Sequence, residues 1–127
     1  MIIDTSALLC ILKGETGWEN IFEAFQKASF KYISTGTCLE VTIVVYQQLG
    51  KAGVEELNRL LDALNVEFMV VTIEDVKSIA VAYPQYGKGQ GHPAQLNFGD
   101  CFTYALAKRL ICQFYVLEMI FFKLTLK

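Results

Sequence analysis

The chain has 127 residues, enough for one domain with a substantial core, and 54% of them are apolar. A formal net charge of −2 argues against a protein that binds nucleic acid through a basic surface, but not against a phosphodiester substrate held through a divalent metal. No apolar run approaches the roughly 20 residues of a membrane helix, and the start lacks the basic region of a signal peptide.

The first half of the chain predicts short strands that alternate with helices. Ile2-Ile3 forms a short strand that stops at Asp4, and Thr5 and Ser6 are suited to cap the helix that follows. A second strand is expected at residues 31–35. Apolar spacing and glycine stops predict helices at residues 7–12, 17–28, 37–49 (closed by Gly50) and, after Gly53, 54–64.

The second half continues the same alternation. Residues 68–71 read as an apolar strand of a sheet covered on both sides, and Thr72 with Asp75 resembles a capping box for a helix through Tyr83. A glycine-rich loop follows at residues 86–93, then a helix opened by Asp100, and a last strand is predicted at residues 113–117. The pattern indicates a single α/β domain with a mainly parallel sheet flanked by helices.

The cysteines and the single histidine do not form a zinc motif. Cys10, Cys38, Cys101 and Cys112 are spread through apolar segments without a C-x-x-C pair, as expected of buried thiols in a reducing cytoplasm. His92 sits in the glycine-rich loop, where a hydrogen bond that orders the loop is favoured over a role as general base.

Three acidic residues stand beside apolar segments that otherwise look like core: Asp4, Glu40 and Asp100. Asp4 ends a predicted strand, whereas Glu40 and Asp100 lie near the starts of helices, so all three can meet at one edge of the sheet. Oxygen ligands of this kind suit Mg²⁺ or Mn²⁺, which can activate a water molecule and neutralise charge on a phosphodiester. Thr5 or Ser6 can add a hydroxyl to a ligand or to a metal-bound water.

Each acid also has a purely structural interpretation. Asp4 alone is explained as a helix cap, Glu40 as a solvated residue on an amphipathic helix, and Asp100 as a charge favoured by a helix dipole. Spacing alone does not decide, because no metal-binding motif of fixed spacing connects the three.

Three segments resemble PIN-domain ribonucleases of the VapC toxin type, over roughly residues 1–112. They are Met1-Ile2-Ile3-Asp4-Thr5-Ser6-Ala7-Leu8, then Tyr32-Ile33-Ser34 followed by Leu39-Glu40, and the long segment 87–108, which contains His92-Pro93-Ala94-Gln95-Leu96-Asn97-Phe98-Gly99-Asp100. The last segment is the most specific.

The resemblance implies a PIN-like three-layer α/β domain with Asp4, Glu40 and Asp100 as catalytic metal ligands. It further implies a Mg²⁺- or Mn²⁺-dependent endoribonuclease that acts as the toxin of a toxin–antitoxin pair. RNA is then the substrate, a VapB-type antitoxin the partner, the homodimer the usual assembly and the cytoplasm the expected location.

Residues 113–127 depart from the family pattern. The family supplies a fourth acid in a string like Gly-Asn-Asp-Phe, whereas this chain offers only Glu118, a weak substitute among apolar residues. The shifted reading frame that starts at the third base of Cys112 permits Pro-Ile-Leu-Cys-Ile-Gly-Asn-Asp-Phe-Phe-Gln-Thr-Asp-Ile-Lys. The Asp codon of its Gly-Asn-Asp-Phe string is forced, because Met119 ends in G and Ile120 begins with AT. We therefore hypothesise a frameshift near Cys112, natural or introduced in sequencing.

Two other functions compete with this interpretation. One is a catalytically impaired PIN homologue that retains antitoxin binding or dimerisation, which the altered tail favours. The other is a receiver-type signalling domain, which needs paired acids after its first strand, and the single Asp4 argues against it.

Overall fold

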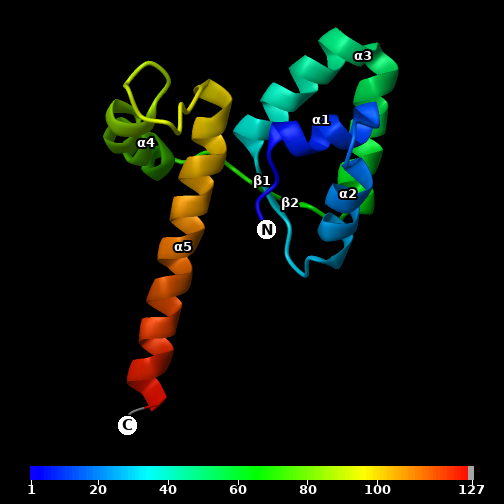
Figure 1. Ribbon diagram of the computed structural model, residues 1–127. Coiled ribbons are helices and arrows are strands. Elements are labelled where there is room, and N and C mark those ends of the chain that lie inside the picture. The colour runs from blue at the N-terminus through cyan, green and yellow to red at the C-terminus, as the bar shows by residue number, and fades with distance from the viewer. Residues whose placement is uncertain (126–127) are drawn as a thin grey trace.

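The computed structural model describes the backbone of residues 1–125 and the side chains of residues 1–113. Helices and strands alternate along much of the chain (Figure 1), and the elements, in order, are α1 (Thr5–Lys13), α2 (Trp18–Lys27), β1 (Tyr32–Ser34), α3 (Thr35–Ala63), β2 (Glu67–Met69), α4 (Ile73–Tyr86) and α5 (Phe98–Thr125).

A small parallel sheet joins the N-terminal segment, β1 and β2. β1 pairs with β2 in parallel, with Ile33 opposite Phe68. On its other side Tyr32 forms a parallel bridge with Ile2, supported by bonds from Ile3 N to Tyr32 O (2.8 Å) and from Tyr32 N to Met1 O (2.9 Å). The predicted α/β class with parallel strands is confirmed.

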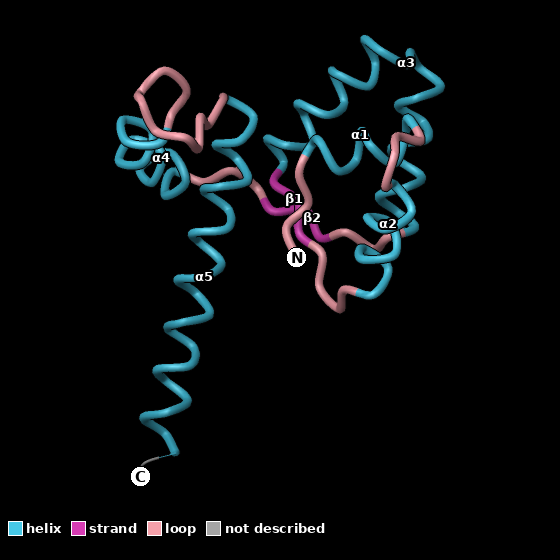
Figure 2. Tube along the Cα trace, in the orientation of Figure 1, coloured by secondary structure: helices cyan, strands magenta, loops and turns pink. Residues whose placement is uncertain are grey.

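The strands lie between two groups of helices (Figures 1 and 2). α1, α2 and α3 pack on one side, while α4 and α5 pack against each other on the other side. The main core lies in the first group, where the N-terminal segment, α1, β1 and α3 contribute side chains with no exposed surface: Ile3, Leu8, Ile33, Val41, Val45 and Leu57. The starts of α1 and α3 are thereby fixed relative to the sheet.

The predicted helices at 37–49 and 54–64 form one element, α3, with a kink. Gly50 has φ 70° and ψ −166°, outside the helical region, and a residue with a side chain would be strained at that φ. The predicted stop at Gly50 is therefore a bend between two helical segments. The predicted capping box of α4 is present, with Asp75 N donating to Thr72 Oγ1 (3.3 Å) and Thr72 N donating to Asp75 Oδ2 (3.1 Å).

The predicted last strand at residues 113–117 is wrong, because α5 continues through this segment to Thr125. The physical reason lies in the sequence: no glycine or proline follows Gly99, so nothing interrupts the helix. The β-propensity of Phe114, Tyr115 and Val116 does not outweigh helix continuation, since strand propensity depends on neighbouring strands.

The expectation of a sheet covered on both sides also fails at β2. Phe68 is 51% exposed and Val70, just beyond the strand, is 65% exposed. β2 pairs only with β1 among the described strands, so the apolar run at residues 68–71 forms an open edge of the sheet.

Candidate metal and nuclease site

Asp4 follows the first bridge of the sheet and caps α1. Its Oδ1 accepts hydrogen bonds from Ala7 N (3.0 Å) and from Ser6 Oγ (3.1 Å). The prediction that Thr5 and Ser6 cap this helix is therefore corrected: the cap is Asp4, and Ser6 donates to it. A carboxylate is well placed there, because a helix N-terminus favours negative charge.

Glu40 lies in the second turn of α3 and is half-buried. Thr5 Oγ1 donates to its Oε1 at 2.5 Å, a link between the start of α1 and α3. Its Oε2 lies against Gly99 of α5, at the place that a Cβ atom of any other residue would occupy. The Glu40 carboxylate is therefore held between the neighbours of Asp4 and of Asp100, and it is not freely solvated.

Asp100 lies in the first turn of α5, which begins at Phe98 and not at Asp100 as predicted. Asn97 N donates to Asp100 Oδ2 (3.0 Å), and Asp100 N donates to Asn97 Oδ1 (2.9 Å). This reciprocal pair has the geometry of a capping box. The bond to Oδ2 fixes the orientation of the Asp100 side chain and uses only one of its two carboxylate oxygens.

The three acids are brought to the starts of three neighbouring helices, but they do not form a compact cluster. Among the described residues, no three acidic, histidine or cysteine side chains gather closely enough to hold a metal ion. Within the same residues, Asp4 Oδ2, Glu40 Oε2 and Asp100 Oδ1 accept no hydrogen bond, and none of the three acids pairs with a lysine or arginine. One spare oxygen on each carboxylate fits the oxygen ligands that Mg²⁺ prefers.

Glu118, the weak substitute for a fourth acid, lies outside the described side chains.

The thiols next to these acids are protonated at neutral pH. Burial raises the pKa of Cys101, and the negative charge of Asp100 raises it further. Burial also raises the pKa of Cys38, two residues before Glu40. All four cysteines are free thiols.

His92 orders the glycine-rich loop, as expected. Its Nδ1 accepts a hydrogen bond from Ala94 N (3.0 Å), and its ring meets Tyr86 edge-on with centroids 4.9 Å apart. The exposed Lys88 is tied into the same loop through a bond from its backbone N to Leu96 O (2.8 Å).

Sequence reasoning missed the buried ion pair between α4 and α5. Arg109 Nε donates to Asp75 Oδ1 at 3.0 Å, and Arg109 Nη2 donates to Val70 O at 3.0 Å. The exposed fractions of the Arg109 and Asp75 side chains are only 17% and 8%. Arg109 therefore fixes α5 to α4 and does not face solvent or phosphate.

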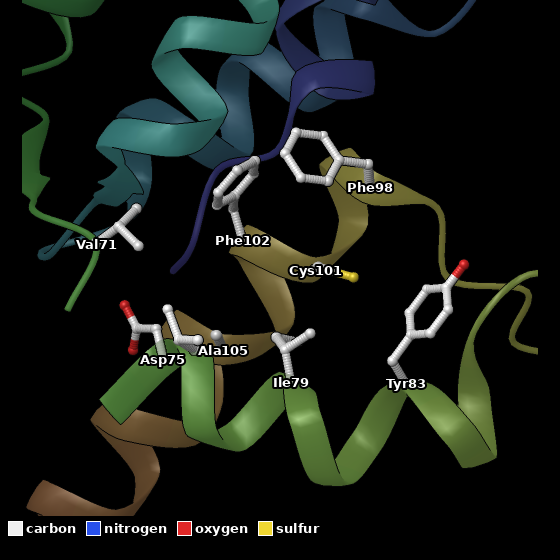
Figure 3. A pocket seen from close by; sticks show the side chains of 9 residues that line it. Val71, Asp75, Ile79, Tyr83, Phe98, Cys101, Phe102 and Ala105 are labelled. Atoms are coloured by element: carbon white, nitrogen blue, oxygen red, sulfur yellow. The ribbon is translucent and has the colours of Figure 1, made fainter. Parts of the chain in front are cut away.

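A groove of about 310 Å³ separates the facing sides of α4 and α5 (Figure 3). Ile79 and Tyr83 line it from α4, and Cys101 and Ala105 line it from α5. Asp75 is at one end, already paired with Arg109, so the groove itself is apolar and offers no free catalytic group.

The same region of the chain defines its family. The model of the PIN domain family matches residues 1–114, and the chain therefore belongs to the PIN domain family. Its relatives include "Ribonuclease VapC" of Mycolicibacterium smegmatis, which is 41% identical over 108 residues, covering 85% of this chain and 83% of the relative. "VapC ribonuclease Mb0640" of Mycobacterium bovis is 38% identical over 108 residues, and "Ribonuclease VapC42" of Mycobacterium tuberculosis is 36% identical over 109 residues; each comparison covers 85% of this chain and 82% of the relative.

Two residues beside the acids were not singled out from the sequence: Asn97, which orients Asp100, and Gly99, which admits the Glu40 carboxylate. The Asn-x-x-Asp spacing of residues 97–100 resembles a capping box, and this pattern can be found in the sequence. Gly99 carries no comparable signal, because its role depends on the approach of α3.

Proposed function

We propose that the protein is a metal-dependent endoribonuclease that acts as the toxin of a toxin–antitoxin pair. One observation supports the proposal: Thr5 Oγ1, next to Asp4, donates to the Glu40 carboxylate, whose other oxygen lies against Gly99, next to Asp100. Membership of the PIN domain family and relatives named as VapC ribonucleases support the same activity.

Asp4, Glu40 and Asp100 would hold Mg²⁺ or Mn²⁺ through their spare oxygens. Such an ion, when bound, lowers the pKa of an attacking water and neutralises charge on the phosphodiester. The chain's own hydrogen bonds prepare the ligands: Thr5 orients Glu40, Ser6 orients Asp4, and Asn97 orients Asp100. Each of these donors holds one oxygen and leaves the other for the ion.

The proposed substrate is RNA, and the proposed partner is a VapB-type antitoxin, with a homodimer as the assembly. The names of the relatives support the RNA substrate and the VapB-type antitoxin. A cytoplasmic location is supported by the four free thiols, since thiols persist in reducing compartments. No helix in the described residues is long and apolar enough to cross a membrane.

Cleavage of a mixed cellular RNA pool tests the activity. We expect cleavage by the purified chain with Mg²⁺ or Mn²⁺, none with EDTA, and none by Asp100→Asn, which keeps an acceptor for Asn97 N. Asp62→Asn is the matched control, because it makes the same change of charge at an exposed acid on α3 and should cleave like the wild type. Equal cleavage with and without EDTA would refute metal dependence.

A catalytically impaired homologue that retains antitoxin binding or dimerisation is the second candidate. It is favoured by the absence of a compact three-acid cluster among the described residues and by the helical continuation of α5. A folded chain that binds antitoxin but cleaves no RNA under any metal would support this candidate and exclude the first.

A further inference from the structure

Phe98 is an unusually exposed aromatic residue beside the candidate site. It is the most exposed large apolar side chain among residues 1–113, at 78%, and it begins α5 two residues before Asp100. Its ring meets the Phe102 ring edge-on, with centroids 5.0 Å apart and an interplanar angle of 78°. Both rings project from the start of α5 in Figure 3. Exposed apolar surface of this kind often marks an interaction site.

Phe98 and Phe102 form one wall of a pocket of about 250 Å³ between α5 and the start of α3. Leu39, Glu40 and Ile43 line the opposite wall, and Gly36 leaves room for the Phe102 ring, which occupies the place of a Cβ atom there. The pocket is smaller than the roughly 300–1,000 Å³ typical of sites for drug-sized ligands.

The pocket wall suits a flat, largely apolar group. The exposed side chains of Leu39, Ile43 and Phe98 are apolar, and Glu40 is the only wall residue with a charged side chain. Glu40 is also a candidate metal ligand, so the pocket adjoins the candidate site.

We propose that Phe98, supported by Phe102, is the platform on which one base of single-stranded RNA stacks beside the candidate site. This inference rests on the proposed nuclease function. Every base has an aromatic face, and proteins that bind single strands use exposed aromatic side chains in this way. Because the wall offers few hydrogen-bonding groups, the stacking should show little base specificity.

Fluorescence tests the stacking without cleavage. In a Trp18→Phe background, Phe98→Trp should show saturable quenching by a single-stranded oligoribonucleotide, with Ca²⁺ in place of Mg²⁺. Phe30→Trp in the same background is the matched control. Phe30 is 67% exposed but precedes β1, at the opposite ends of the strands from Asp4, and should not be quenched. Equal quenching of both variants, or none at position 98, overturns the proposal.

Kinetics separate this role from the nuclease function itself. Phe98→Ala should raise KM for RNA roughly tenfold with little change in kcat, Phe98→Tyr should restore KM, and Phe30→Ala should change neither. An unchanged KM in Phe98→Ala, with weaker antitoxin binding, would assign the surface to a protein partner and overturn the proposal. If the wild type cleaves no RNA, the nuclease function fails, and the quenching experiment alone decides the stacking.

Discussion

At the scale of single residues, the acids of the candidate site combine structural and chemical roles. Asp4 caps α1 and Asp100 belongs to a capping box, each with one oxygen. Their positions were predictable, because a strand end and a helix start can be found from local sequence. The contact of Glu40 with Gly99 was not predictable, because it depends on how α3 and α5 pack.

The first prediction concerns this contact. Gly99→Ala should displace the Glu40 carboxylate, because the new Cβ atom would take the place of Oε2. The free energy of unfolding should change by no more than about 1 kcal/mol, since the displaced group is the end of a flexible side chain and alanine favours a helix. RNA cleavage should fall by at least roughly tenfold, because small displacements of catalytic groups are costly.

Urea unfolding and RNA cleavage, measured on the same preparation, check this prediction. Lys108→Ala, an exposed change on the same helix, should alter neither. Full activity in Gly99→Ala would show that the position of the Glu40 carboxylate does not matter.

The second prediction concerns the thiols. Because burial raises the pKa values of Cys38 and Cys101, less thiolate is present at a given pH, and a disulfide reagent should modify both slowly. The exposed Cys112 should react quickly at pH 8. The slow reaction of Cys38 and Cys101 should accelerate as the pH rises through their raised pKa values. Cys112→Ala should remove only the fast phase of the reaction.

The same shifts affect stability in one direction. A raised pKa in the folded state means that folding favours the neutral thiol. The contribution of this thiol to the free energy of unfolding is fully present below the ordinary thiol pKa, and it is lost as the pH rises through the raised pKa. A fast reaction of Cys101 at pH 8 in the folded chain would contradict its burial.

At the scale of elements, sequence pattern predicted helices better than strands. The α4 capping box and the Gly50 break follow from local chemistry that the chain carries in a few residues. The strand at residues 113–117 did not form, because a strand requires a neighbour in the sheet, whereas α5 can simply continue. The pair that joins α4 to α5 connects residues 34 positions apart, and no local pattern shows it.

The third prediction concerns this pair. Arg109→Met should lower the free energy of unfolding by about 3 kcal/mol, because it leaves the buried Asp75 carboxylate without its partner. Lys77→Met is the matched control: it breaks the exposed pair with Glu74, and should cost less than about 0.5 kcal/mol. Denaturant unfolding of both variants checks the difference, and equal losses would show that Arg109 contributes only as a surface charge.

At the scale of the whole molecule, the sheet is smaller than the predicted strands suggested, because the strand expected at residues 113–117 is helical. Among the described strands, residues 1–3 form hydrogen bonds only with β1. β2 likewise has no neighbour other than β1 among these strands. The family match ends at residue 114. Fold class was therefore predictable from the alternation of elements, whereas the extent of the sheet was not.

The fourth prediction concerns the tail. Coding DNA should contain a frame change near Cys112, with codons that spell Gly-Asn-Asp-Phe in the shifted frame. A chain with the restored tail should cleave RNA faster than this one, because it regains a fourth carboxylate. Codons unable to produce that string would sink the hypothesis, and equal rates for the two chains would show that three acids suffice.

The open edge at β2 has a consequence for how the protein behaves at high concentration. Phe68 of β2 and Val70 just beyond it expose apolar surface along this edge, and Glu67 is the only charged residue of the strand. Salts that strengthen apolar association should promote precipitation that begins at this edge, and dilution should oppose it.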